Sequence, residues 1–148
     1  MKTFTFILCV ILLFSCSEKN KKDIEVKSPT MEGAWELVSF LNYKEDGSVD
    51  TIKSSNAYRQ MKMYSGTKVM WSRLRTSDSL DWFGVGNYTF KDGVLTEVLD
   101  YGSKAMESRI KMNKKFVFNI LIDENNFTQI EVDSLEKPTY AENYRRVE

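Results

Sequence analysis

Apolar residues recur at every second position along most of the chain after residue 31, and turn-forming residues interrupt this alternation at short intervals. Such a pattern is typical of an antiparallel, all-β domain. The strongest turn signal is Asp92-Gly93, because these two residue types readily adopt the positive φ angles of a type I′ hairpin turn. The alternation predicts strands over residues 35–41, 58–64, 68–75, 85–91, 94–101, 107–112, 116–122, 127–132 and 144–147.

These segments give about nine strands with mostly short connections, and no helix of normal length is expected. Sequential hairpins favour closure into an up-and-down barrel, which leaves no exposed sheet edge. A Greek-key sandwich is the alternative, since alternation alone does not reveal the pairing order. Residues 42–57 are expected to form a small hairpin or a short helical cap, and residues 76–83 a polar loop. The expected fold class is all-β, an antiparallel up-and-down β-barrel of about eight to nine strands.

The start of the chain has a different pattern. Lys2 is followed by an almost uninterrupted apolar run over residues 4–14. One positive charge and about ten apolar residues are typical of a secretory signal, and the run is too short to span a bilayer. The run ends in Leu13-Phe-Ser-Cys16, which resembles the lipobox of bacterial lipoproteins, although Phe14 departs from the small residue usual there.

The lipobox resemblance implies that residues 1–15 are a signal peptide and that acyl chains such as palmitate are attached to Cys16. Residues 16–30 would then be a polar tether and residues 31–148 the folded domain, anchored by its lipid in the bacterial cell envelope. Ser17 stands where inner-membrane lipoproteins of well-studied enterobacteria carry Asp, so the outer membrane is favoured. The membrane is thus the expected partner of the N-terminus.

Composition narrows the chemistry that the domain can perform. Lys and Arg together number 21, as do Asp and Glu, so no basic excess is present to attract nucleic acid. The chain has no histidine, and its two cysteines, Cys9 and Cys16, both precede the predicted domain. Disulfides, cysteine-ligated metals and the commonest general base near neutral pH are therefore excluded. We expect a monomeric, non-enzymatic domain without catalytic residues, metal or cofactor.

Three short segments resemble the lipocalins and the wider calycin superfamily. Gly33-Ala-Trp35 is similar to their Gly-x-Trp opening motif, and Gly84-Val-Gly-Asn-Tyr-Thr-Phe90 to a hairpin in the middle of bacterial lipocalin-like barrels. Tyr144-Arg-Arg146 is similar to their last strand. A second lipocalin motif and a disulfide are missing, so the resemblance is to lipocalin-like domains in general.

This resemblance implies structural roles at the closed end of the barrel. Trp35 would plug that end, and an arginine of the last strand would lie over its ring. Arg146 is preferred to Arg145 because it shares a face with Tyr144. An eight-stranded barrel has room inside for side chains or for one small ligand.

Methionine and aromatic residues in the middle of the chain are candidates for contact with such a ligand. Methionine adapts to guests of varied shape, but the same residues would also form an ordinary barrel core. Aromatic residues in the 76–83 loop would line the barrel mouth, since core packing does not explain them. Arg73 either points inward, where fatty-acid-binding relatives pair an arginine with a carboxylate, or lies on the solvated outer face. The candidate ligand-binding residues are Trp82, Phe83, Met61, Met63, Met70, Trp71 and Arg73.

Two functions are compatible with these features. The first is an envelope protein that binds a small hydrophobic or amphipathic ligand inside the barrel. The alternative is a filled barrel that acts as a protein-interaction or structural module of the envelope. An internal cavity of roughly 300 Å³ or more beside Trp82 would favour the first function, and a solid interior would favour the second.

Overall fold

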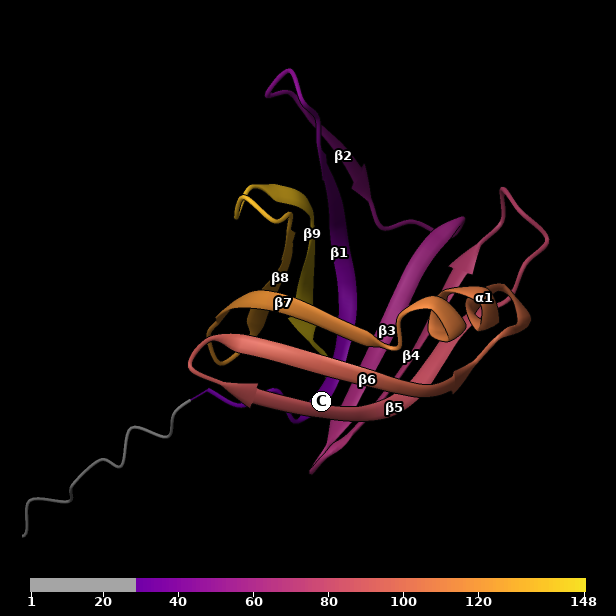
Figure 1. Ribbon diagram of the computed structural model, residues 1–148, viewed down its shortest axis with the longest axis vertical. Helices are drawn as coiled ribbons and strands as arrows, with labels where there is room; N and C mark the ends of the chain where they lie inside the picture. Colours follow the sequence, from indigo (N-terminus) through magenta and orange to yellow (C-terminus); the bar gives the residue numbers. More distant parts are fainter. Residues whose placement is uncertain (1–28) are drawn as a thin grey trace, which may run out of the picture.

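The computed structural model describes residues 29–148, which form a curved β-sheet with a short helix beside it (Figure 1). The predicted signal peptide, Cys16 and residues 17–28 of the predicted tether lie outside the described residues. Within residues 29–148, no helix has the length and hydropathy needed to cross a membrane. The elements are β1 (Gly33–Tyr43), β2 (Val49–Lys53), β3 (Tyr58–Ser65), β4 (Lys68–Arg75), β5 (Trp82–Lys91), β6 (Val94–Gly102), α1 (Lys104–Met112), β7 (Lys115–Ile122), β8 (Asn126–Val132) and β9 (Pro138–Arg146).

The sheet closes on itself as an up-and-down barrel. From β3 onward each strand pairs antiparallel with the next one, and β1 pairs with β3 on one side and with β9 on the other. Eight strands therefore make up the closed barrel, while β2 pairs only with the second half of β1. The predicted barrel is confirmed and the sandwich alternative is wrong, because the β1–β9 pairing removes the two edges that a sandwich would leave.

Local turn chemistry explains the tightest connection in the sheet. Asp92 and Gly93 join β5 to β6 with φ angles of 53° and 76°. Two successive positive φ angles are those of the type I′ turn, whose twist matches the twist of the flanking strands. The longer interval at residues 42–57 contains the hairpin between β1 and β2, which was one of its two predicted forms.

Helix α1 is the clearest departure from the predicted elements. The strand predicted over residues 107–112 is wrong, because this segment belongs to a helix between β6 and β7. Ile110 and Met112 are two residues apart, which suggested a strand, but Met112 is exposed. The apolar stripe that packs against the barrel is instead Met106 and Ile110, with the four-residue spacing of one helix face.

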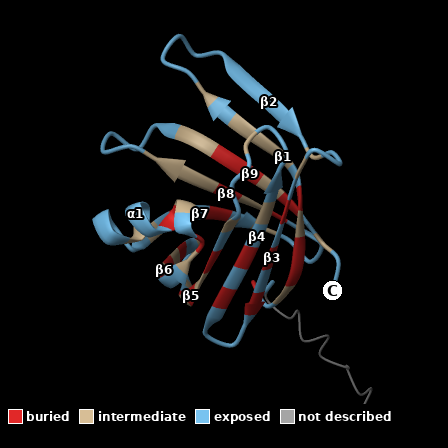
Figure 2. Cartoon of the chain, turned by 90° about the vertical axis from the view of Figure 1, so that its right-hand side faces the viewer, coloured by how far each residue is buried: buried red, intermediate tan, exposed pale blue. Residues whose placement is uncertain are grey.

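Side chains alternate between the interior and the surface along each strand, and on β3 and β4 the buried positions follow this alternation closely (Figure 2). On β3 the inward residues are Gln60, Lys62 and Tyr64. Polar side chains thus occupy the inner face of β3, where the methionines were predicted to lie.

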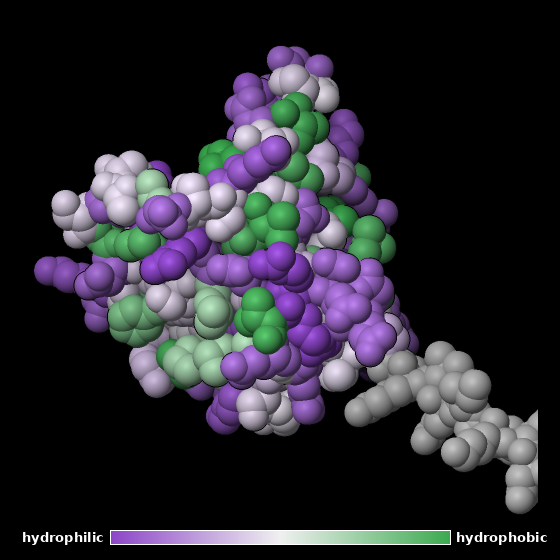
Figure 3. Space-filling model, turned by 180° about the vertical axis from the view of Figure 1, so that it is seen from behind, coloured by the Kyte–Doolittle hydropathy of each residue, from purple (hydrophilic) through white to green (hydrophobic). Residues whose placement is uncertain are grey.

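The three methionines that were predicted to line the interior lie on the outer surface, so this prediction is wrong. Met61, Met63 and Met70 are 43%, 45% and 48% exposed. A period of two fixes which residues share a face but not which face is inside. Seen from behind, the surface carries apolar groups scattered among hydrophilic ones (Figure 3).

Candidate ligand-binding site

The closed end of the barrel is sealed around Trp35, which is fully buried. Its indole Nε1 donates a hydrogen bond to the Met31 carbonyl at 2.7 Å. The Arg146 guanidinium carbon lies 3.9 Å from the centre of the Trp35 ring, in the arrangement that the lipocalin resemblance implied. Arg146 also donates hydrogen bonds to three backbone carbonyls, those of Thr30, Glu32 and Glu124. Because all three of its nitrogens donate hydrogen bonds, Arg146 holds the last strand against the start of the domain.

Above the closed end, a buried ion pair crosses the barrel interior. Lys62 Nζ lies 2.9 Å from Glu97 Oε1, and both residues are 2% exposed. The same ammonium donates to Gln129 Oε1 at 2.8 Å, and Tyr64 donates its hydroxyl proton to Glu97 Oε1 at 2.6 Å. Several partners for each charge are needed to offset the cost of removing both ions from water.

A second ion pair lies nearer the mouth and is joined to the first. Arg73 Nη2 donates to Glu142 Oε1 at 2.6 Å, and Arg73 Nε donates to Gln60 Oε1. Gln60 donates to the Tyr144 hydroxyl, which donates to Glu142 Oε2, both at 2.7 Å. Gln129 connects the two pairs, because it accepts from the ammonium of the first and donates to Glu142 Oε2 at 3.0 Å.

Among the described residues, every buried side-chain nitrogen or oxygen in this network has a hydrogen-bond partner. Burial and the neighbouring carboxylates raise the pKa of the Tyr64 and Tyr144 hydroxyls well above their ordinary value. Both tyrosines therefore remain proton donors at physiological pH. A polar interior that is satisfied in this way gives the barrel a rigid, hydrophilic floor.

A cavity of about 290 Å³ lies between this floor and the open end. Gly84 on β5 leaves space for the indole of Trp71, since a Cβ atom there would lie 2.9 Å from that ring. The apolar and aromatic lining consists of Phe40, Trp71, Trp82, Leu99, Met106, Phe116, Phe118 and Tyr140. The polar lining consists of Gln60, Lys62, Arg73, Arg75, Glu97, Arg109, Gln129 and Glu142.

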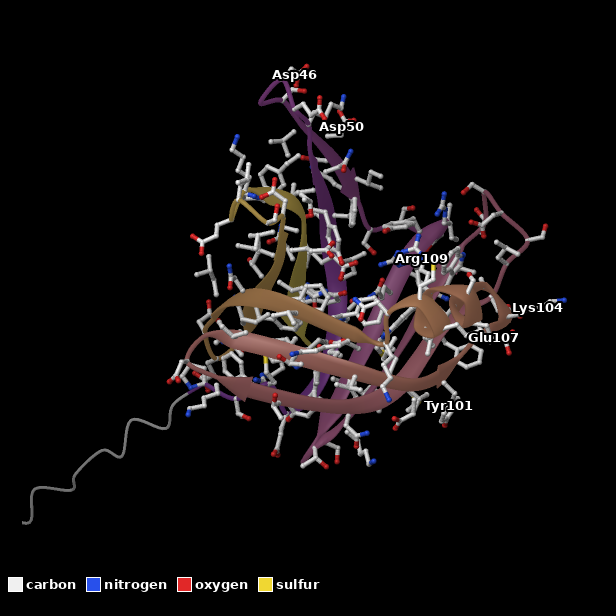
Figure 4. The ribbon with its side chains drawn as sticks, in the orientation of Figure 1. Asp46, Asp50, Tyr101, Lys104, Glu107 and Arg109 are labelled. Atoms are coloured by element: carbon white, nitrogen blue, oxygen red, sulfur yellow. The ribbon has the colours of Figure 1, made fainter. Side chains whose placement is uncertain are left out.

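Helix α1 and the start of β5 form one side of the mouth. Trp82 is half-buried, and its Nε1 lies 3.3 Å from Asp78 Oδ1, to which it donates a hydrogen bond. The Arg109 guanidinium carbon lies 5.9 Å from the centre of the Trp82 ring. Arg109 points from α1 toward the barrel opening, whereas Lys104 and Glu107 of the same helix point away from it (Figure 4).

The structure brings together three of the seven predicted ligand-binding residues. Trp71, Arg73 and Trp82 line the cavity, and Arg73 has the inward orientation that the alternation left open. Phe83 does not line this cavity, because it follows Trp82 on a strand and so faces the outside, near Leu80. The 76–83 loop ends at residue 81, and both aromatic residues belong to β5.

The polar floor was missed at the sequence level, and so was Arg109. Gln60 and Lys62 alternate with methionines, and this alternation was the available signal that one face of β3 is polar. Arg109 was expected on a strand, and only the Met106–Ile110 spacing indicated a helix. Within residues 29–148, no three acidic side chains lie close enough together to hold a metal ion.

Comparison with solved structures shows a lipocalin-like barrel. A crystal structure of a lipocalin-like protein from Bacteroides uniformis ATCC 8492 has a TM-score of 0.51 at 15% identity, over 78% of this chain and 96% of that one. A crystal structure of an uncharacterized protein from Bacteroides eggerthii DSM 20697 has the same TM-score at 13% identity, over 79% and 99% of the two chains. At such identities the likeness concerns the fold alone. No protein-family model matches the chain, and no match was found among curated proteins.

Proposed function

We propose that this domain binds one small amphipathic molecule inside its barrel and is held in the bacterial cell envelope by a lipid at Cys16. The observation that supports binding is the cavity of about 290 Å³ with Trp82 at its mouth. Its volume lies just below the range for ligand pockets, about 300–1,000 Å³. It corresponds to roughly ten water molecules of liquid volume, so the ligand is small.

The two kinds of lining support an amphipathic ligand over a purely apolar one. Rings such as Trp71, Phe118 and Tyr140 offer apolar area, each Å² of which contributes about 25 cal/mol when it is removed from water. The same lining also carries two exposed cations, Arg75 and Arg109, which a hydrocarbon alone would separate from water. Covering such groups without new hydrogen bonds is unfavourable.

The test compares two neighbouring positions on β4. Native mass spectrometry and tryptophan fluorescence would measure binding of decanol and decanoate, whose chains of about ten carbons suit a cavity of this volume. Trp71→Leu, which removes an indole from the cavity wall, should weaken binding. Met70→Ala, one residue away on the outer surface, should leave it unchanged. Equal effects of the two variants, or no binding by the unmodified domain, would refute ligand binding in the cavity.

The alternative function would use the outer surface instead of the interior. Met63, Met70, Val85 and Tyr101 are neighbours across β3 to β6 by strand register and form an apolar row on the outside. If decanol, decanoate and every molecule that co-purifies from the native cell fail to occupy the cavity, a protein-interaction module becomes the better description. The Met70→Ala variant would then be the one that loses function.

The anchor is tested separately from the cavity. Each buried CH₂ of an acyl chain contributes about 0.8 kcal/mol, so two or three chains hold a domain on a membrane where one holds it only marginally. Metabolic labelling with a clickable fatty acid should label the full chain, and Cys16→Ser should abolish the label. Labelling that persists in the variant, or a wild-type protein that takes up no label, would refute the anchor. Fractionation of the two membranes would then test the outer-membrane assignment.

A further inference from the structure

We propose that three arginines at the mouth, Arg73, Arg75 and Arg109, bind an anionic head group of the ligand, while its apolar part lies in the aromatic cavity. This inference rests on the proposed function, since it specifies the class of molecule that the cavity takes. The ligand is thus an amphipathic anion, with a carboxylate, sulfate or phosphate group at the mouth of the barrel.

The three arginines come from two elements and line the same cavity. Arg73 and Arg75 are two residues apart on β4, and both line the cavity. Arg73 is the register partner of Trp82 on β5. Arg109 approaches the same indole from α1, at 5.9 Å from its centre. The mouth side of the cavity therefore carries three arginines, one of which contacts the Trp82 ring.

The negative charges at the mouth do not balance these three cations. Arg73 pairs with Glu142, and Arg75 Nε lies 3.2 Å from Asp78 Oδ2. Among residues 29–148, Arg109 has no carboxylate within 4.0 Å; Glu107 of the same helix pairs with Lys111 at 3.9 Å instead. One positive charge is thus left over at the mouth, whereas the deeper Lys62–Glu97 pair is neutral.

Unused donors reinforce this charge excess. A guanidinium has five N–H donors in a planar fork that matches carboxylate, sulfate and phosphate oxygens. The side-chain hydrogen bonds of Arg75 within the described residues involve only its Nε, and the side chain of Arg109 forms no hydrogen bond there. Both side chains are exposed, so their free donors are solvated until a ligand arrives. The Lys62–Glu97 pair deeper in the barrel has a different role, because its two charges neutralise each other.

Four probes with the same ten-carbon chain separate the head group from the apolar part: decanoate, decyl sulfate, decanol and decyltrimethylammonium. All are titrated below their micelle-forming concentrations and followed by tryptophan fluorescence. We expect decanoate and decyl sulfate to bind about tenfold more tightly than decanol, since one charge-assisted hydrogen bond supplies about that factor. Decyltrimethylammonium should bind most weakly. If decanol binds as tightly as the two anions or more tightly, the inference is overturned.

A matched pair of variants on α1 assigns the effect to Arg109. Arg109→Gln should weaken decanoate binding about tenfold and leave decanol binding unchanged. Lys104→Gln removes the same charge from the same helix on the side away from the mouth, and it should change neither affinity. Arg109→Lys should retain part of the decanoate affinity because it keeps the charge without the planar fork.

Equal losses in Arg109→Gln and Lys104→Gln would show only a general effect of net charge and would refute the site. The failure of the proposed function gives a different result. If none of the four probes binds the unmodified domain, ligand binding in the cavity itself is wrong. If decanol binds and the head group makes no difference, only the arginine site is wrong.

Discussion

The two ends of the barrel carry the same pair of residue types in different states. At the closed end, Arg146 lies 3.9 Å from the centre of a tryptophan ring, and at the mouth Arg109 lies 5.9 Å from another. Trp35 is fully buried, whereas Trp82 is half-buried. A cation over an indole contributes about 0.5–1 kcal/mol when exposed and about 2 kcal/mol when desolvated. The closed-end pair is therefore the more stabilising of the two.

The partners of the two arginines explain this difference better than the residue types do. Arg146 donates to three backbone carbonyls, so its guanidinium is fixed and has little left to offer a ligand. The guanidinium of Arg109 forms no hydrogen bond within the described residues and keeps its donors available. An arginine on a tryptophan is thus a structural element where all three of its nitrogens donate to the backbone, and it is a candidate binding element where none of them does.

The largest effect that we expect is at the closed end. Trp35→Ala should lower the free energy of unfolding by about 3–5 kcal/mol, as expected when a fully buried aromatic residue is truncated. That loss would exceed a third of the stability of many domains of this size, about 5–15 kcal/mol. Chemical denaturation monitored by far-UV circular dichroism measures it. A midpoint that stays within error would mean that Trp35 is not the plug of the barrel.

The next effect concerns the polar floor between the two ends. Lys62→Met should cost about 3 kcal/mol, because it leaves the Glu97 carboxylate buried without its cation. Adding Glu97→Gln should recover much of this loss, since the amide oxygen still accepts the hydrogen bond from Tyr64. Denaturation of both variants tests the network, and a double variant that is less stable than the single one would contradict this account.

Sequence reasoning succeeded where the determinants of structure are local. Asp92-Gly93 defines a type I′ turn by itself, and a run of such hairpins leaves barrel closure as the simplest outcome. The floor could not be found in this way, because its residues depend on partners far along the chain. Lys62 is buried only because Glu97 and Gln129, 35 and 67 residues later, accept hydrogen bonds from its ammonium group. Without these partners, burial of Met63 in its place would be favoured.

The site was predictable only in part for the same reason. Trp35 and Arg146 were found through a motif, and Trp82 because it was assigned to a polar loop, although it begins β5. Arg109 was misplaced because its short segment fits both a strand and a helix period, and packing of α1 on the barrel decides between them. Tertiary contacts thus determine the mouth more than the closed end.

Alkaline pH provides a third test, directed at the polar floor. The pKa values of Tyr64 and Tyr144 are raised in the folded state, so these hydroxyls stay protonated there while the unfolded chain ionises near pH 10. Their stabilising contribution is complete below pH 10 and is lost as the pH rises further. The slope for each tyrosine is about half of its limit at pH 10 and approaches that limit, about 1.4 kcal/mol per pH unit, at higher pH. Denaturation series between pH 8 and 11 should show this fall, and Tyr64→Phe should make it less steep. An identical slope in the variant would exclude Tyr64 as a source.

The smallest stability effect is expected at the mouth. Trp82→Ala should cost only about 1 kcal/mol of unfolding free energy, because the side chain is half-buried and packs against the edge of the core. The same change should weaken decanoate binding by about 1–2 kcal/mol, or roughly tenfold, through loss of apolar contact and of the ring beside Arg109. Phe83→Ala, at the next residue and facing outward, is the control that should leave binding unchanged. Denaturation and fluorescence titration of the two variants separate stability from binding. A loss of stability as large as that of Trp35→Ala would make Trp82 a second structural plug, and the contrast between the two ends would disappear.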